Sequence, residues 1–371
     1  MVCLFVEKRK VNFDEKNVFN FGTSGFSDNK KDICAILGSG NIKLASFLNW
    51  PEVLRVARHS SVSPSLYLTT KHNEKELCVP DEIYKELKLD YTICSFSNQI
   101  KLEDFERVSF EFKKTNISFI LLKGIHLLNT AFSFDSGARA IGDIDILVKE
   151  DDLVDASRIL TVLGYKYLEP SANARPTRMF IKKSETGVEL AVHLHTHIVN
   201  LSEIFLDDDL ARINLDDIFS SANVTAPLFG KDAGLLMKNE HMLISLCEHG
   251  FRHGFARLGL LYDIHKFIGY AENNLDWQEV KRTSSNWSIK APVCQGLYLS
   301  RLFFGTNIEA DFLSQLCPKG FSLLERYLLT RIAKYDYLKE YEYPFLYFLQ
   351  KKSLFSKARF LRTCFSNKFR I

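Results

Sequence analysis

The chain has 371 residues, of which 46% are hydrophobic, and its formal net charge at pH 7 is only +3. This length and apolar content exceed one ordinary small domain, so we expect two or three packed units with real cores. The nearly balanced charge excludes the strongly basic composition that is typical of nucleic-acid-binding proteins.

Two further features of the composition indicate a cytoplasmic protein. No run of about 18 apolar residues predicts a membrane-spanning helix, and the apolar stretch after Met1 is too short for a signal peptide. The eight cysteines are scattered without a Cys-x-x-Cys pair. This spacing argues against a zinc knuckle or a disulfide framework and fits a reducing compartment, with most cysteines acting as small buried hydrophobes.

The N-terminal part of the chain is expected to be helical after a short arm. Residues 1 to about 30 are polar and punctuated by glycine, so they predict a loosely ordered arm. Helical spacing follows over residues 32–48, 50–57, 81–87 and 97–114, and Pro64 suits the first turn of a helix in between. The last of these helices places four apolar side chains on one stripe: Leu102, Phe105, Val108 and Phe112.

A strand and a helix are expected to meet at Lys123-Gly124. Residues 117–122 are apolar and rich in branched side chains, which predicts a buried strand, and residues 125–134 predict a helix. Gly124 would then stand at the helix N-terminus, where free backbone N–H groups and the helix dipole favour an anion.

The next predicted strand, residues 141–148, carries two aspartates. Because side chains alternate along a strand, Asp143 and Asp145 are expected on one face, opposite the apolar residues. Two adjacent carboxylates repel each other unless a cation lies between them, and Mg²⁺ is commonly shared between carboxylates and substrate phosphates. A metal-binding pair beside a phosphate site predicts phosphoryl or nucleotidyl transfer.

The remaining elements follow in order. A helix is predicted from Glu150 to Gly164, and residues 179–183 and 187–195 predict an antiparallel hairpin. In its second strand Glu189, Ala191, His193 and His195 share the face opposite the core. From Lys238 onwards the pattern is helical.

These motifs carry a resemblance to a known family. The order Leu122-Lys123-Gly124, Arg139 and then Gly142 to Val148 is similar to the uncharacterised branch of the minimal nucleotidyltransferase, or DNA polymerase beta-like, superfamily. That branch has Lys-Gly, an Arg and Asp-x-Asp, followed by Leu-Gly-Tyr, here at Leu163 to Tyr165, and a strand ending in Leu-His, here Leu194-His195. The resemblance spans roughly residues 35 to 320.

The resemblance implies an α/β (α+β) fold: a minimal nucleotidyltransferase core with a short mixed sheet, flanked by N- and C-terminal helical regions. On this basis we expect five units: an arm at residues 1–30, an N-terminal helical region at 31–97, the core at 98–200, a connection at 201–236 and a C-terminal helical domain with a basic tail at 237–371.

The resemblance also implies that a nucleotidyl group moves from an NTP to an unknown small-molecule or protein acceptor with Mg²⁺ or Mn²⁺. Asp143 and Asp145 would hold the metal, and Gly124 would let the backbone approach the phosphates. Lys123 and Arg139 would neutralise phosphate oxygens, Arg139 bidentately.

The superfamily supplies a third carboxylate from the neighbouring strand, and the matching position in this chain is His193. Glu189 lies on the same strand face but roughly 13 Å away along the strand. Three alternatives remain open: His193 is a nitrogen ligand, which would favour Mn²⁺ or Zn²⁺ over Mg²⁺; Glu189 substitutes; or the metal site is weakened.

Other residues have competing interpretations. His193, His195 and His197 could form a zinc cluster, although only their alternation supports it. His249 and His253 are expected to line the cleft between the helical and catalytic units or simply to pack, and Arg257 and Asp263 to form a structural pair. The basic residues of 351–371 predict either a closing helix or a surface for anionic lipid or nucleic acid.

Two alternatives to catalysis follow from these observations. His193 at the third ligand position favours a degenerate member of the family that binds nucleotide without turnover. The basic tail favours an interaction protein whose helical regions carry the function.

Overall fold

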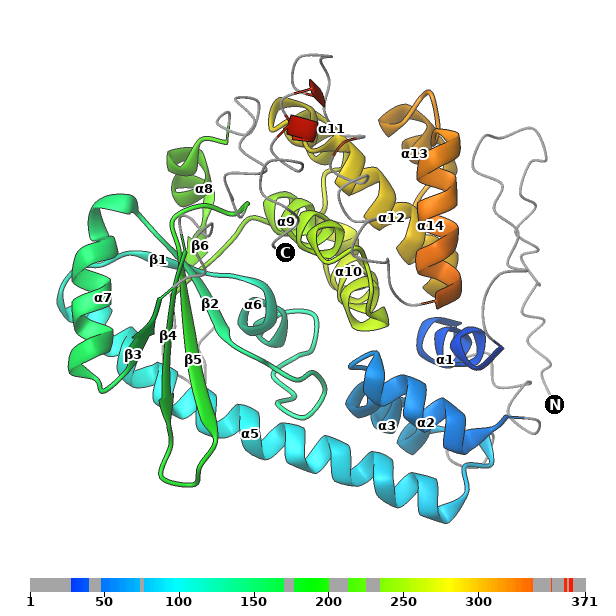
Figure 1. Cartoon of the computed structure of the whole chain (residues 1–371), viewed down its shortest axis with the longest axis horizontal. Coiled ribbons are helices and arrows are strands. Elements are labelled where there is room, and N and C mark those ends of the chain that lie inside the picture. Colours follow the sequence, from blue (N-terminus) through cyan, green and yellow to red (C-terminus); the bar gives the residue numbers. More distant parts are fainter. Residues whose placement is uncertain are drawn as a thin grey trace.

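The computed structural model describes residues 28–39, 48–73, 77–169, 177–199, 213–224 and 234–335, with a few positions between 348 and 362. A mixed sheet lies on one side of the molecule, and helices from both ends of the chain gather on the other side (Figure 1). The predicted mixed α/β fold with flanking helical regions is therefore confirmed. Residues 1–27 of the expected arm, most of the 201–236 connection and most of the basic tail lie outside the described residues.

The sheet has seven strands among the described residues, in the order β3-β4-β5-β2-β1-β7-β6. β2 is antiparallel to β1 and parallel to β5, so the sheet is mixed as predicted. The expected hairpin is present as the antiparallel pair β4 and β5. The strand bounds are β1 Phe119–Leu121, β2 Ile144–Val148, β3 Lys166–Leu168, β4 Thr177–Lys183, β5 Glu189–His195, β6 Asn223–Val224 and β7 Leu235–Leu236.

The central strand β2 is buried along its whole length. It begins at Ile144, later than the predicted 141–148, so Asp143 precedes the strand and only Asp145 lies within it. Because both faces of β2 are covered, its apolar residues are not confined to one side, as is usual for a central strand. Asp145 is therefore a buried carboxylate rather than part of a solvent-facing strand surface.

A single helix, α5 (Asp81–Lys114, 34 residues), replaces the two helices predicted at 81–87 and 97–114. No glycine or proline interrupts residues 88–96, so nothing in that stretch stops the helix. α5 runs below α2 and α3 and continues under the sheet (Figure 1). The predicted stripe from Leu102 to Phe112 is buried. The expected unit boundary between residues 97 and 98 falls inside this helix.

The N-terminal helices are α1 (Asp28–Ser39), α2 (Trp50–His59) and α3 (Ser63–His72), with Pro64 in the first turn of α3 as predicted. α1 packs against α12 (Lys290–Phe304) as well as against α2 and α3. Gly38 permits this approach, because a Cβ there would overlap the backbone carbonyl of Phe304. Lys30 also donates a hydrogen bond to the carbonyl of Ile332 (3.2 Å). The two helical regions therefore contact each other.

Three short helices belong to the sheet region: α6 (Lys123–Asn129), α7 (Leu153–Val162) and α8 (Leu215–Ser221). α6 ends at Asn129, before the predicted Phe134, because Thr130 already leaves helical geometry (φ −124°, ψ −90°). Ser133 and Phe134 then adopt left-handed conformations (φ +50° and +61°) that a right-handed helix does not contain. The remaining helices confirm the helical pattern after Lys238 as far as Tyr335: α9 Asn239–Arg252, α10 Leu258–Ala271, α11 Trp277–Asn286, α13 Ala310–Leu316 and α14 Leu323–Tyr335.

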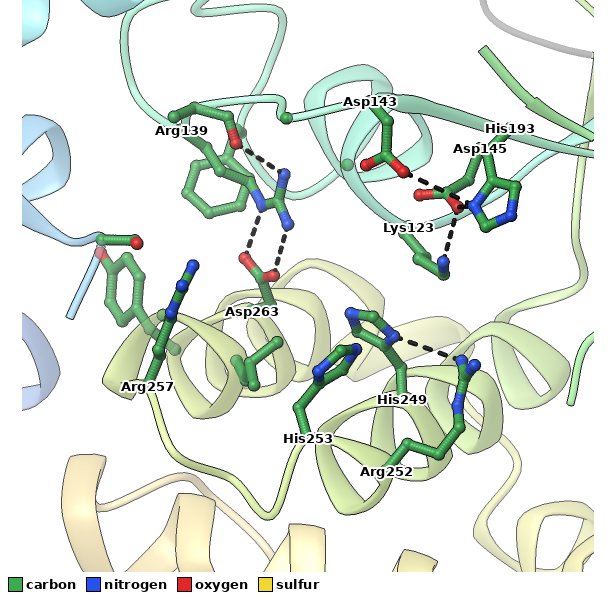
Figure 2. A pocket seen from close by; sticks show the side chains of 18 of the residues that line it. Lys123, Arg139, Asp143, Asp145, His193, His249, Arg252, His253, Arg257 and Asp263 are labelled. Atoms are coloured by element: carbon green, nitrogen blue, oxygen red, sulfur yellow. Dashed lines mark hydrogen bonds and ion pairs between the residues drawn. The ribbon is translucent and has the colours of Figure 1, made fainter. Parts of the chain in front are cut away.

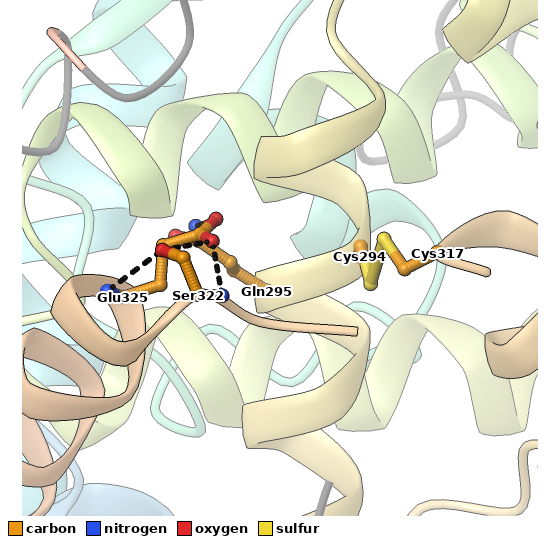
Figure 3. Close-up of a disulfide and its surroundings, with 5 residues drawn as sticks. All are labelled: Cys294, Gln295, Cys317, Ser322 and Glu325. Atoms are coloured by element: carbon orange, nitrogen blue, oxygen red, sulfur yellow. Dashed lines mark hydrogen bonds between the residues drawn. A yellow bond between two sulfur atoms is a disulfide. The ribbon is translucent and has the colours of Figure 1, made fainter. Parts of the chain in front are cut away.

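One cysteine pair corrects the sequence expectation. Cys294 in α12 and Cys317 at the end of α13 form a disulfide, with 6.5 Å between their Cα atoms (Figure 3). The two cysteines are 23 residues apart, so no short sequence motif indicates that they pair. Cys34, Cys94 and Cys247 are buried, as expected for small hydrophobes. Within the described ranges, no helix combines the length and apolar character needed to cross a bilayer.

Candidate functional site

A cavity of about 530 Å³ lies between the sheet region, the helices α9 and α10, and the start of α3. Its lining includes side chains from α6, β2 and β5 on the sheet side and from α9 and α10 on the helical side. Ser61 and Ser65, near the start of α3, contribute to the same lining. Figure 2 shows the charged residues of the two sides facing each other across this space.

Lys123 and the two aspartates of the sequence motif, Asp143 and Asp145, all line this cavity. Lys123 is the first residue of α6, and its ammonium nitrogen lies 2.6 Å from Oδ1 of Asp145. Lys123 has a φ of +46°, an uncommon value for a residue with a side chain. The residue expected to meet phosphate thus forms a buried ion pair with the residue expected to bind metal.

Two histidines of β5 contact the same carboxylate. In the parallel pairing of β2 and β5, Asp145 lies opposite His193. Oδ1 of Asp145 is 2.6 Å from Nε2 of His195 and 3.4 Å from Nδ1 of His193. Burial alone would raise the pKa of Asp145, but the charge of Lys123 and the hydrogen bonds from the two histidines hold that pKa well below its usual 3.8.

Asp143 occupies a different environment from Asp145. Its side chain is 35% exposed, whereas that of Asp145 is 4% exposed. Oδ2 of Asp143 lies 3.6 Å from Nδ1 of His193. Burial alone would lower the pKa of His193, but the hydrogen bonds to Asp143 and Asp145 outweigh it and raise that pKa. His193 therefore bridges the two carboxylates.

The donor set of this cluster fits a divalent cation. Asp145, His193 and His195 each offer one ligand atom, and these atoms all lie within 4.8 Å of one another. Two imidazoles and one carboxylate suit Mn²⁺ or Zn²⁺ better than Mg²⁺, which prefers oxygen. Burial lowers the pKa of His195 to about 4, so its imidazole is neutral at pH 7, as a ligand must be. In this structure the ammonium of Lys123 already satisfies Oδ1 of Asp145.

The sequence pattern offered His195 as a metal ligand only in a zinc cluster with His193 and His197, and not in a site shared with the two aspartates. Glu189 stands at the exposed start of β5, paired with Lys183 across the hairpin, and is outside the cavity lining. His197 accepts a hydrogen bond at Nδ1 from the backbone N–H of Val199. The structure therefore brings His193 and His195, but neither Glu189 nor His197, to the two aspartates.

Arg139 has a partner that the sequence did not reveal. Its Nε and Nη2 donate to the two oxygens of Asp263 in α10, both at 2.7 Å, and Nη1 donates to the carbonyl of Ala140. The predicted pairing of Asp263 with Arg257 is therefore wrong. Nη1 of Arg139 also lies 2.6 Å from where a Cβ on Gly124 would be. Glycine at position 124 therefore leaves room for this guanidinium, independently of any phosphate.

The loop that carries Arg139 is fixed from α5. The buried Asn98 donates from Nδ2 to the carbonyls of Ser136 and Arg139, both at 2.7 Å, and accepts the N–H of Ile141 at Oδ1 (3.0 Å). Lys101, one turn further along α5, donates to the carbonyl of Ile141. These contacts fix the backbone that leads into Asp143, and no sequence motif pointed to Asn98.

The opposite wall carries a histidine pair on α9. The rings of His249 and His253 are 4.6 Å apart and line the cavity, which confirms one of their two expected roles. Arg252 lies between them in sequence, with its Nε 3.2 Å from the Glu248 carboxylate. Desolvation, reinforced by the charges of Arg252 and Lys123, lowers the pKa of His253 to about 4. The pKa of His249 is lowered by the same causes, so both rings are neutral at pH 7.

The comparison with protein families agrees with this geometry. A family model described as "Uncharacterised nucleotidyltransferase" matches residues 47–305, which is more than half of the chain. The match begins before α2, includes the whole sheet and ends just after α12. It therefore covers every residue of the cavity lining. No curated protein matches the chain.

Proposed function

Because the chain belongs to this uncharacterised nucleotidyltransferase family, we propose that it transfers a nucleotidyl group from an NTP to a small-molecule or protein acceptor in the cavity. The observation that carries the proposal is the convergence of Lys123, Asp143 and Asp145 on one wall of a 530 Å³ cavity. Cationic side chains on that wall can meet a triphosphate, and the carboxylates beside them can share a metal with it.

The residues that would hold a divalent cation are Asp143, Asp145, His193 and His195. When bound, such an ion supplies Lewis-acid alignment of the phosphate that is attacked. Because two of the four residues donate nitrogen, we expect Mn²⁺ to be preferred to Mg²⁺. This assignment adds His195 to the Asp143, Asp145 and His193 set expected from the sequence and leaves out Glu189, which was the alternative to His193.

The basic residues act on the phosphates. Lys123 forms its ion pair with one oxygen of Asp145, so phosphate oxygens and Asp145 compete for the same ammonium group. Asp263 engages Nε and Nη2 of Arg139. Nη1, which lies over Gly124, donates to the carbonyl of Ala140, so only its second N–H remains for a ligand.

The test is a screen of the four NTPs with Mg²⁺ or Mn²⁺. Pyrophosphate release is measured, and mass spectrometry of the protein and of added metabolites detects a nucleotidyl adduct. We expect pyrophosphate release in the wild type and none in Asp143→Asn. The proposal fails if no NTP binds with either metal.

A second candidate function is nucleotide binding without turnover. The Lys123–Asp145 ion pair and His193 at the third carboxylate position favour it, because both reduce the negative charge available to hold two cations. NTP binding without pyrophosphate release, with every acceptor class offered, would establish this function in place of transfer.

A further inference from the structure

The cationic side chains that line the cavity are almost all paired with carboxylates. Lys123 pairs with Asp145 at 2.6 Å, and Arg139 pairs with both oxygens of Asp263. Arg252 lies against Glu248 at 3.2 Å. Each of these positive charges therefore has an anion of the protein beside it before any substrate enters.

Arg257 is the exception. Arg257 directly precedes α10 and lines the same cavity, and its side chain is exposed. Among the residues that the structure describes, none forms a hydrogen bond or an ion pair with its guanidinium. Asp263, the nearby carboxylate of α10, accepts hydrogen bonds from Arg139 at both of its oxygens, so its charge is already compensated by another guanidinium. Arg257 thus presents an unneutralised, planar donor group to the cavity.

Two neighbours of Arg257, His253 and the N-terminus of α10, leave its positive charge without compensation. The neighbouring His253 is neutral at pH 7, and the charge of Arg257 is one of the causes that lower its pKa. Arg257 also stands at the N-terminal end of a 14-residue helix, whose dipole adds to the positive potential. A group that enters this end of the cavity meets positive charge and no free carboxylate of α10.

Arg257 is separated from the Asp143–Asp145 cluster. Figure 2 shows the Arg139–Asp263 pair between Arg257 on one side and Lys123, Asp145 and His193 on the other. The cavity therefore has two ends that differ in charge pattern. One end combines carboxylates with Lys123 and two histidines, and the other offers a guanidinium alone.

We infer that Arg257 anchors a second anion subsite, which takes the phosphate or carboxylate group of a substrate in the proposed transfer reaction. A guanidinium recognises both groups by the same pair of parallel N–H···O hydrogen bonds. The anion belongs either to the acceptor or to the far end of the NTP triphosphate. The inference rests on the proposed function for the identity of the substrate, but not for the presence of the anion subsite.

The probe is inorganic phosphate, titrated against the full-length protein and followed by ³¹P NMR, with and without saturating ATP and Mn²⁺. The variant is Arg257→Gln, and Arg257→Lys tests whether charge without the planar fork suffices. Arg107→Gln is the matched control, because Arg107 is an exposed arginine of α5 that lies outside the cavity lining. It removes the same net charge from another part of the surface.

We expect Arg257→Gln to weaken binding of phosphate or of ATP by about tenfold, Arg257→Lys to recover part of it and Arg107→Gln to change it less than twofold. An acceptor subsite predicts that phosphate binds to the ATP-loaded protein and that ATP affinity is unchanged. A subsite for the triphosphate predicts that ATP displaces phosphate and that the variant weakens ATP but not AMP.

The inference is overturned if Arg257→Gln and Arg107→Gln have equal effects on both ligands. If phosphate binding depends on Arg257 but no NTP binds, the proposed function fails while the anion subsite stands. If NTP is turned over and Arg257→Gln changes neither affinity, the proposed function stands and the subsite is rejected.

Discussion

Lys123 and Asp145 share one short contact, 2.6 Å between Nζ and Oδ1, and their side chains are only 13% and 4% exposed. The pair links the first residue of α6 to the second residue of β2. Each residue was expected from the sequence to meet a different part of a substrate complex, the phosphate and the metal. Their contact shows that each first neutralises the other.

The first prediction contrasts the two aspartates in stability. Asp145→Asn leaves the buried ammonium of Lys123 without its counter-charge, so we expect a loss of about 3 kcal/mol in the free energy of unfolding. Asp143→Asn, which is partly exposed, should change it by about 0.5 kcal/mol or less.

Urea denaturation at pH 7 measures both variants. The pKa of Asp145 is lowered in the folded state, so its stabilisation is complete above its ordinary pKa of 3.8 and is lost as the pH falls below that value. The deficit of Asp145→Asn should accordingly shrink in acid. The double variant Lys123→Met, Asp145→Asn should cost less than the sum of the two single changes, and strict additivity would contradict the coupling.

The second prediction concerns phosphate recognition. Lys123→Gln and Arg139→Lys should each weaken ATP binding by about tenfold and adenosine binding by less than twofold, because only ATP carries the charge that these side chains meet. Calorimetric titration of both ligands in the presence of Mn²⁺ provides the comparison. Equal losses for ATP and adenosine would show that the side chains act through the fold or the base.

The third prediction concerns His193, which lies opposite Asp145 across the parallel strands. His193→Asp would restore a third carboxylate and remove a nitrogen donor, so we expect the metal preference to shift from Mn²⁺ towards Mg²⁺. Metal affinity measured by calorimetry, together with pyrophosphate release, tests this shift. Glu189→Gln is the control, because Glu189 lies outside the cavity, and a loss equal to that of Asp145→Asn would refute the histidine assignment.

The fourth prediction concerns the loop before Asp143. Asn98→Ala removes three hydrogen bonds that fix Ser136, Arg139 and Ile141, so we expect a loss of about 2 to 3 kcal/mol in the free energy of unfolding. ATP affinity should fall as well, because Arg139 loses its support. Asp104→Asn breaks a contact of α5 with Lys182 outside the cavity and should reduce stability without changing ATP affinity.

The fifth prediction is a pH dependence of stability. Burial lowers the pKa of His126 from 6.5 to about 4 in the folded state. The unfolded chain therefore binds a proton between these values that the folded chain does not, and stability falls as the pH decreases from 6.5 towards 4. The slope from this residue is about 1.4 kcal/mol per pH unit. His126→Gln should flatten the profile by that amount, and an unchanged slope would contradict the assignment.

Strand alternation and motif order predicted which residues around Asp145 converge. Lys123 follows β1, which pairs with the strand β2 that carries Asp145, so the order of the motifs placed both residues in one site. Strand alternation placed His193 and His195 on one face. These are local regularities with a period of two residues. Glu189 lies on the same strand face by this alternation, so the choice of face did not exclude it. Its distance along the strand from the two aspartates does.

The contacts that join distant parts of the chain were not predictable in this way. Arg139 and Asp263 are 124 residues apart. Cys294 lies in α12, and Cys317 directly follows α13. Neither pair carries a spacing that identifies its partner, because the tertiary packing of α10, α12 and α13 creates the contact. Asn98 is a single polar residue in a long helix, and its role depends entirely on the loop that packs against it.

The contact between α1 and α12 has a consequence for the nascent chain. Lys30 and its acceptor Ile332 are 302 residues apart, and Gly38 packs on the last residue of α12. During translation α1 leaves the ribosome first, and its α12-facing side stays uncovered until most of the chain has been synthesised. The packing of α1 on α12 can therefore form only after α12 has been synthesised, and a chain that stops before α12 exposes a surface of α1 that this fold buries.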